Sequence, residues 1–243
     1  MIAGGLSAAA MVSLWESVDG FHPIDRALAL LDAVDDGADG ELATLPVGRR
    51  DALLLELRRR TFGDRVRGFA DCPSCAEPLE LELSTAELIE ATVAPLPSPL
   101  TMQEWSVALR LPDSRDLAAA ASVADPSAQR QLLIERCLHD PRHHGAPIAT
   151  AALPADVIAA AGDALEAADP LADLHLDLEC PDCGHGWRAS FDVEDFLWLE
   201  LHGAVRRLLR QVHDLARHYG WRESDILAMS PKRRQAYLGL AYG

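Results

Sequence analysis

Four cysteines occur in two short pairs with the same spacing, Cys72-Pro-Ser-Cys75 and Cys180-Pro-Asp-Cys183. Cysteine thiolates are strong zinc ligands, and four of them complete the closed tetrahedral shell of a structural zinc site. The proline inside each pair favours a tight turn, and Gly184 follows the second pair, where the chain must reverse direction around an ion. We therefore predict one structural Zn²⁺ per chain, held by these four cysteines.

The sequence leaves other interpretations of the cysteines open: four reduced thiols, or two disulfides in small turns. His185, beside the second pair, could also replace one thiolate as a ligand. The repetition of the pair in matching contexts favours zinc, in a reducing compartment rather than a secreted disulfide framework. Four thiolates leave no open position for water or substrate, so we expect a structural metal and not a catalytic one. The fifth cysteine, Cys137, lies among helix-forming apolar residues and is expected to be a buried core thiol.

Alternating apolar and polar residues flank both pairs, as is typical of half-buried strands. The apolar positions are Leu79, Leu81 and Leu83 after the first pair, and Leu174, Leu176 and Leu178 before the second. The sequence thus predicts a zinc ribbon whose two halves are separated by residues 76–179. Loop-closure entropy grows only logarithmically with length, so this long insertion costs little. A metal that closes it would constrain the unfolded chain.

Helical periodicity, prolines and glycines predict most of the other elements. We expect helices within 9–33, after Pro46 as far as Gly63, at 116–121, 127–138, 153–168 and 193–219, and after Ser230-Pro231. We expect a strand at 105–111 beside the ribbon strands. The predicted fold is α+β and mainly helical, with a small antiparallel sheet organised by the four-cysteine zinc ribbon. Its predicted parts are an N-terminal helical region at 1–68, the ribbon sheet with a helical insertion (about 113–170) at 69–195, and a C-terminal helical module at 196–243.

Three histidines, His139, His143 and His144, lie in the stretch HDPRHHGAP. Its proline and glycine predict an exposed loop. Histidines at this spacing can ligate zinc, and a hydrolase with a second metal is the alternative that they raise. Metal-binding histidines are usually held in place by a neighbouring carboxylate, and the sequence does not define one beside these three. We therefore expect the histidines to be exposed and to bind no metal.

The net charge of the 243-residue chain is −16, which argues against general binding to nucleic acid or to membranes. From residue 203 onward, however, the sequence contains eight basic residues and only three acidic ones. An acidic body with a basic end indicates docking onto another surface. Five arginines at 49–60 are expected to be solvated or paired, with an anion site as the alternative. The first residues lack the basic start of a signal peptide, so we expect an intracellular protein.

The basic end carries the candidate partner-binding residues, which are Trp221, Arg222, Lys232, Arg233, Arg234 and Tyr237. Two short helices at this spacing fit either a helix–turn–helix module for DNA or a helical hairpin that packs on a protein. The acidic remainder of the chain favours a protein partner. The sequence shows no Gly-rich phosphate loop and no arrangement of catalytic side chains that we can place, so we predict no enzymatic activity.

Several stretches together resemble a family of zinc-ribbon baseplate proteins encoded with contractile phage tails and extracellular contractile injection systems. These proteins are known as T-even-type baseplate hub subunits or hub assembly chaperones. The stretches are WESVDGFHPIDRALALL (15–31), LPVGRRDALLLELRRRTFG (45–63), CPSC (72–75), LRLP (109–112), CPDCGHGW (180–187), FDVEDFLWLEL (191–201) and VHDLARHYGWRESDILAMSPKRRQAYL (212–238).

The resemblance implies a structural or assembly protein that binds other baseplate, hub or spike components. The net charge, rather than the resemblance, argues against membrane or nucleic acid as partner. The resemblance also implies assembly in the cytoplasm and a place in the finished particle as one possible fate. No catalytic residue belongs to the pattern. The alternative is a zinc-ribbon nucleic-acid-binding or regulatory protein that uses the basic C-terminal helices.

Overall fold

The computed structural model describes residues 4–34, 41–89 and 95–242. The helices of these parts are α1 (Ala8–Val18), α2 (Pro23–Asp32), α3 (Val47–Phe62), α4 (Thr85–Ile89), α5 (Ser114–Ala121), α6 (Pro126–Cys137), α7 (Ala155–Ala168), α8 (Val193–Tyr219), α9 (Glu223–Leu227) and α10 (Pro231–Tyr242). The short 3-10 turns are η1 (Leu42–Thr44), η2 (Thr150–Ala152) and η3 (Pro170–Asp173). Among the described residues the α+β, mainly helical fold class is confirmed.

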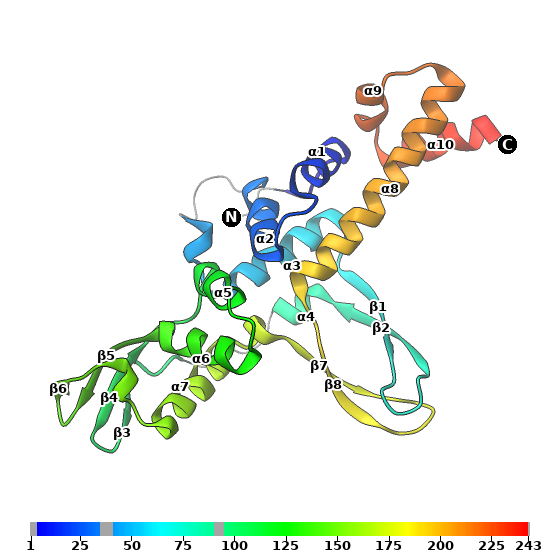
Figure 1. Cartoon of the computed structure of the whole chain (residues 1–243). Helices are drawn as coiled ribbons and strands as arrows, with labels where there is room; N and C mark the ends of the chain where they lie inside the picture. Colours follow the sequence, from blue (N-terminus) through cyan, green and yellow to red (C-terminus); the bar gives the residue numbers. More distant parts are fainter. Residues whose placement is uncertain (1–3, 35–40, 90–94, 243) are drawn as a thin grey trace.

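The strands are β1 (Arg65–Asp71), β2 (Pro78–Ser84), β3 (Leu100–Met102), β4 (Trp105–Leu109), β5 (Leu138–His143), β6 (Ala146–Pro147), β7 (His175–Glu179) and β8 (Gly186–Ser190). Within the described residues they form three antiparallel sheets: the hairpin β1-β2, the hairpin β7-β8 and the four-stranded sheet β3-β4-β5-β6. Figure 1 shows the four-stranded sheet and the two hairpins on different sides of the helical body. The small antiparallel pairing that the sequence predicts is therefore present, divided among three sheets.

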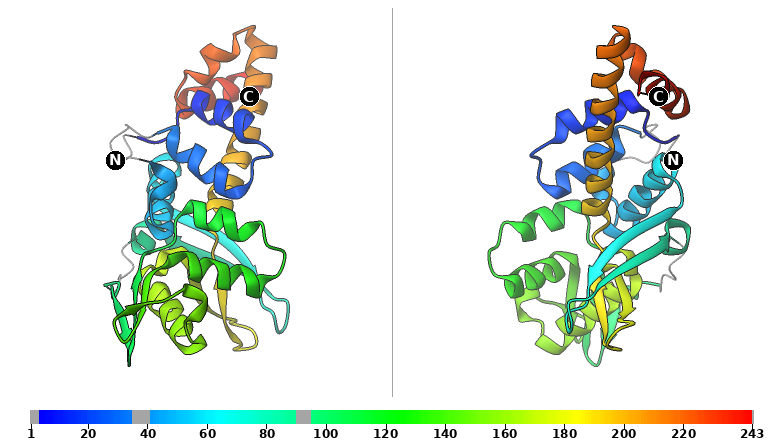
Figure 2. Two further views of the ribbon diagram at one scale, coloured as in Figure 1. Left: turned by 60° about the vertical axis from the view of Figure 1, so that its left-hand side comes forward. Right: turned by 90° about the vertical axis from the view of Figure 1, so that its right-hand side faces the viewer.

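The main hydrophobic core joins the two ends of the chain. Helices α1, α2 and α3 pack against the first half of α8, which runs the length of the helical body (Figure 2). The largest fully buried side chains there are leucines: Leu30, Leu31, Leu54, Leu55, Leu57, Leu197 and Leu201. The predicted boundary at residues 195 and 196 lies inside α8, so the N-terminal helices and the C-terminal module share this helix as a support.

Helix α8 begins and ends where the sequence predicts. The Asp192 side chain accepts from the backbone N–H of Asp195 and caps its start, while Gly220 ends it in the left-handed conformation (φ 70°). Glycine adopts this conformation without the steric cost that a β-carbon brings. No helix in the described residues is long and apolar enough to cross a membrane.

The insertion between the ribbon halves has a core of its own, built by the four-stranded sheet with α6 and α7. Cys137 is fully buried in it, as predicted, and burial raises the pKa of its thiol to about 11. The strand predicted at 105–111 exists as β4, but it pairs with β3 and β5 rather than with the ribbon strands. That part of the prediction was wrong, because sequence periodicity does not specify a strand's partner.

The stretch predicted as an exposed histidine loop forms β5 and β6 instead. The ladder between β4 and β5 shifts register between Ser106 and Ala108, which leaves Asp140 and Pro141 at the irregular position. A proline in a sheet is tolerated at such a bulge, since it has no N–H to donate to the ladder. The proline and glycine signals that predicted a loop therefore mark a bulge and a tight turn.

Candidate metal centre

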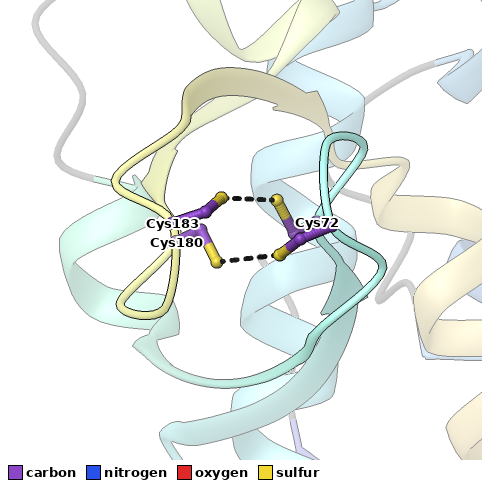
Figure 3. A group of neighbouring side chains, drawn as sticks. Cys72, Cys180 and Cys183 are labelled. Carbon is purple, nitrogen blue, oxygen red and sulfur yellow. Dashed lines mark hydrogen bonds between the residues drawn. The ribbon is translucent and has the colours of Figure 1, made fainter.

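Each cysteine pair lies in the turn of one ribbon hairpin. In the first, Asp71 pairs with Pro78 and the turn holds Cys72 and Cys75; in the second, Glu179 pairs with Gly186 around the other pair. The two chain segments come together from opposite sides, so that all four sulfurs point into one small space (Figure 3). The structure thus brings together the four cysteines that the sequence singled out.

The two turns have the same backbone hydrogen bonds. The N–H of Cys72 donates to the carbonyl of Glu77, and the N–H of Ala76 donates to the carbonyl of Cys72. In the second turn, Cys180 donates to His185 and Gly184 donates to Cys180 in the same way. The repeated sequence pattern therefore produces two equivalent turns, each presenting two thiols on the same side.

The sulfur positions fit a tetrahedral zinc ion. The Sγ atoms of Cys72 and Cys183 are 3.7 Å apart, and those of Cys75 and Cys180 are 3.6 Å apart. Ligands about 2.3 Å from a tetrahedral zinc lie about 3.8 Å from each other. A disulfide would require sulfurs only about 2.05 Å apart, and all four cysteines are free thiols. The geometry therefore fits a metal better than disulfides.

Backbone groups also favour ionised sulfur. Burial raises the pKa of the Cys72 thiol, but hydrogen bonds with the N–H groups of Cys75 and Ser74 and with the Cys75 and Cys183 thiols together lower it to about 7. The N–H of Glu77 lowers the pKa of Cys75, but burial and hydrogen bonds with the other three thiols raise it to about 12. Four thiolates this close repel one another, and a bound divalent cation offsets that repulsion. The donor set is thus suited to a metal ion.

The ribbon surrounds this centre with a small core of its own. Cys72 and Cys180 are buried together with Leu79, and Leu81 and Trp187 pack against them. The His185 ring lies beside the Trp187 ring, with centroids 6.1 Å apart, and the group of potential ligands at this centre consists of the four thiols. The structure therefore favours a four-thiol ligand set over one that includes His185.

The two turns carry different residues at one equivalent backbone position, and the effect of this difference on stability can be tested. Ala76 and Gly184 occupy equivalent places with left-handed φ angles of 60° and 68°. Alanine is strained there and glycine is not, so Ala76→Gly is expected to raise the free energy of unfolding by about 0.5–1 kcal/mol. Gly184→Ala is expected to lower it by about 1 kcal/mol, although a β-carbon would meet no atom within 4 Å. Urea unfolding of the two variants measures both changes. If the free energy of unfolding changed in the same direction in both variants, the backbone explanation would be contradicted.

The predicted partner-binding residues lie in the C-terminal module of α9, α10 and the end of α8. The Trp221 ring stacks on Tyr219 with centroids 4.5 Å apart and meets Tyr237 edge-on at 4.8 Å. These aromatic rings therefore hold the module together. The side chains of Arg222, Lys232 and Arg233 are exposed.

Arg234 differs from its neighbours, because only 3% of it is exposed. Its guanidinium donates to the Gln211 side chain at 3.1 Å and to the carbonyl of Met229. Arg234 thus ties α10 to α8 and is not available on the surface of this chain for a partner. A run of three basic residues in the sequence does not show which of them faces inward.

Two features were missed by sequence reasoning. Glu104 lies beside His143 and His144, although it is distant from them in the sequence. A mostly apolar cavity of about 680 Å³ lies between α5, α6 and α7, with Leu133, Ile134 and Leu165 among its lining residues. Both depend on contacts between separate segments, which no local pattern reveals.

Comparisons with known proteins identify one stretch of the chain. Residues 25–141 match the family model described as T4 bacteriophage base plate protein. The matched stretch runs from α2 into β5 and contains Cys72 and Cys75, but not the second cysteine pair. No curated protein and no solved structure matches the chain. The match supports a relation to phage baseplate proteins and points to a structural rather than an enzymatic role.

Proposed function

We propose that this chain is a non-enzymatic structural or assembly protein of the baseplate of a contractile phage tail or a related contractile injection system. The observation that carries the proposal is the match of residues 25–141 to the T4 base plate protein family. The chain would bind other baseplate, hub or spike components, assembling with them in the cytoplasm. The more specific family, zinc-ribbon hub subunits and hub assembly chaperones, rests on the sequence resemblance described above.

One structural Zn²⁺ at Cys72, Cys75, Cys180 and Cys183 is part of this proposal. A bound zinc would cross-link two hairpins that are separated by the whole insertion. Since four thiolates occupy a tetrahedral shell, the ion would have no position for substrate. The role that this chemistry supports is mechanical: the ion holds the ribbon in one arrangement against the helical body.

The C-terminal module is the proposed partner surface. It lies at the end of α8 that is remote from the ribbon (Figure 1). Exposed basic side chains line α8 and continue into the module: Arg206, Arg207, Arg210, Arg217, Arg222, Lys232 and Arg233. Leu240 and Tyr242 add large exposed apolar side chains, 75% and 71% accessible. An acidic partner surface with an apolar centre matches this combination, because complementary charge steers docking and apolar contacts retain it.

A pull-down of the tagged chain from cells that produce the complete tail gene cluster tests the proposal. The wild-type chain is expected to recover baseplate or hub proteins, and Lys232→Glu/Arg233→Glu is expected to recover at least about tenfold less, since charge reversal introduces repulsion. Arg188→Glu is a matched control, because Arg188 is an exposed arginine on the ribbon strand β8, remote from the module. Absence of every tail protein from the wild-type sample would contradict the proposal.

Nucleic-acid binding is a second candidate function, because α8 and α10 carry exposed basic residues. A protein that contacts several phosphates loses affinity steeply as salt rises. A titration with duplex DNA at low salt therefore separates the two candidates. We expect no measurable binding, because the chain as a whole carries a charge of −16.

A further inference from the structure

A second group of potential metal ligands lies on the four-stranded sheet, in a part of the fold separate from the ribbon (Figure 1). Glu104, His143 and His144 each offer one ligand atom, and these three atoms lie within 4.8 Å of one another. The group belongs to neither the cysteine centre nor the proposed partner surface. Its chemistry therefore needs its own explanation.

Two tight turns bring the three side chains together. β3 and β4 are joined by the turn at residues 103–104, and β5 and β6 by the turn at residues 144–145. Because β4 pairs with β5, both turns lie at the same end of the sheet. The backbone N–H of His144 donates to the carbonyl of Glu104 at 2.8 Å and joins one turn to the other. The positions of the ligands thus follow from the strand register.

The rings of the two histidines are also held by neighbours. Trp105 lies opposite His143 in the register, and the two rings stack with centroids 4.0 Å apart and an angle of 14° between their planes. The His144 ring is 4.4 Å from the His143 ring. Stacking on tryptophan restricts the rotation of the His143 ring, whose Nε2 atom lies near the Glu104 carboxylate.

The distances suit an ion better than a direct hydrogen bond. His143 Nε2 and Glu104 Oε1 are 3.7 Å apart, which is too long for a hydrogen bond. Nitrogen and oxygen ligands about 2.0–2.1 Å from a tetrahedral ion are about 3.3 Å apart, so a small side-chain movement would place both on one ion. The side chains of His143 and Glu104 are 36% and 39% exposed, which gives an ion direct access from solvent.

We propose that Glu104, His143 and His144 bind a divalent transition-metal ion of the zinc type. Two imidazoles and one carboxylate form a ligand set that zinc accepts, with a fourth position left for water. This site is distinct from the closed four-thiol centre and goes beyond the proposed baseplate role. The ion would cross-link the turn at residues 103–104 to the turn at residues 144–145.

Cobalt titration of the full-length, tag-free chain, with the ribbon already loaded with one zinc, tests this proposal. We expect one Co²⁺ per chain to bind with the weak visible bands of nitrogen and oxygen ligation and without a thiolate-to-cobalt charge-transfer band. Zinc content measured before and after the titration shows whether the ribbon ion was displaced. A sulfur band with loss of ribbon zinc, or no cobalt binding, would overturn the proposal.

Three variants assign the ion to these side chains: Glu104→Gln, His143→Ala and His144→Asn. Asparagine tolerates the left-handed backbone (φ 48°) that residue 144 adopts. Each variant is expected to weaken cobalt binding by at least about tenfold, given that even indirect ligand support contributes 10–100-fold. His139→Asn is the matched control on the same strand, because His139 interacts with Arg110 and lies outside the group. Unchanged binding in the combined triple variant, with its ribbon zinc retained, would refute the assignment.

Discussion

Cys180→Ser is expected to release the ribbon metal and to lower the free energy of unfolding by about 4–5 kcal/mol. The reason lies in the unfolded chain, because a metal that joins Cys75 to Cys180 closes a loop of about 100 residues, and a cross-link of that length removes about 4.7 kcal/mol of conformational freedom from the unfolded state. For a chain of this size the melting temperature should fall by about 10–20 °C. Elemental analysis of the purified variant and a thermal melt measure the two effects.

Chelation of the wild-type chain should reproduce this loss, whereas the melting temperature of Cys180→Ser should no longer respond to a chelator. Cys137→Ala is the matched control, because Cys137 is a buried cysteine in a different core, and this variant should retain its ribbon zinc. A wild-type melting temperature for Cys180→Ser would show that the ribbon is stable without a metal. Metal-free wild-type protein with unchanged stability would lead to the same conclusion.

Arg58→Ala is expected to lower the free energy of unfolding by about 3–5 kcal/mol. The Arg58 side chain is 3% exposed and donates to both carboxylate oxygens of Glu200, each at 2.8 Å, and to the carbonyls of Gly63 and Arg65. It therefore joins α3 to α8 and to the start of the first ribbon strand. Truncation leaves Glu200 without its counter-charge and two carbonyls without a donor, which is far more costly than the loss of a surface pair.

The neighbouring Arg59 provides the comparison for this prediction. Its side chain is 43% exposed and pairs with Glu56 at 2.7 Å within the same helix. Because water screens such a pair, Arg59→Ala is expected to change the free energy of unfolding by less than about 1 kcal/mol. Urea unfolding of both variants measures the difference, and similar losses would contradict the importance of burial. The double variant Arg58→Met/Glu200→Met should be more stable than Arg58→Ala, because it leaves no unpaired charge.

These expectations concern the two connections that position the ribbon. The metal would join its hairpins to each other, and Arg58 joins the first hairpin to the helical body. The proposed baseplate role would require the chain to keep its surfaces in defined positions while it contacts neighbouring proteins. Measuring partner recovery with the Cys180→Ser and Arg58→Ala variants would show whether the ribbon arrangement matters for assembly.

Local signals in the sequence were sufficient for many elements. The repeated Cys-Pro-x-Cys pattern singled out the four cysteines that lie together in the structure, because the spacing of the residues in each tight turn is a local property. Helix α8 was predicted from Val193 to Tyr219 because its apolar period, its start and the glycine after it all lie within one segment. Pro23 and Gly63 marked helix ends for the same reason.

Contacts between distant segments could not be predicted in this way. The sequence placed β4 beside the ribbon and interpreted β5 as a loop, because strand partners depend on the packing of the whole chain. It also did not reveal that Arg234, one of the candidate partner-binding residues, is buried. The same holds for Glu104, which the register of two turns brings to His143 and His144. Local patterns therefore specified the two cysteine turns and the limits of several helices, whereas strand register and packing of the whole chain select which distant side chains meet.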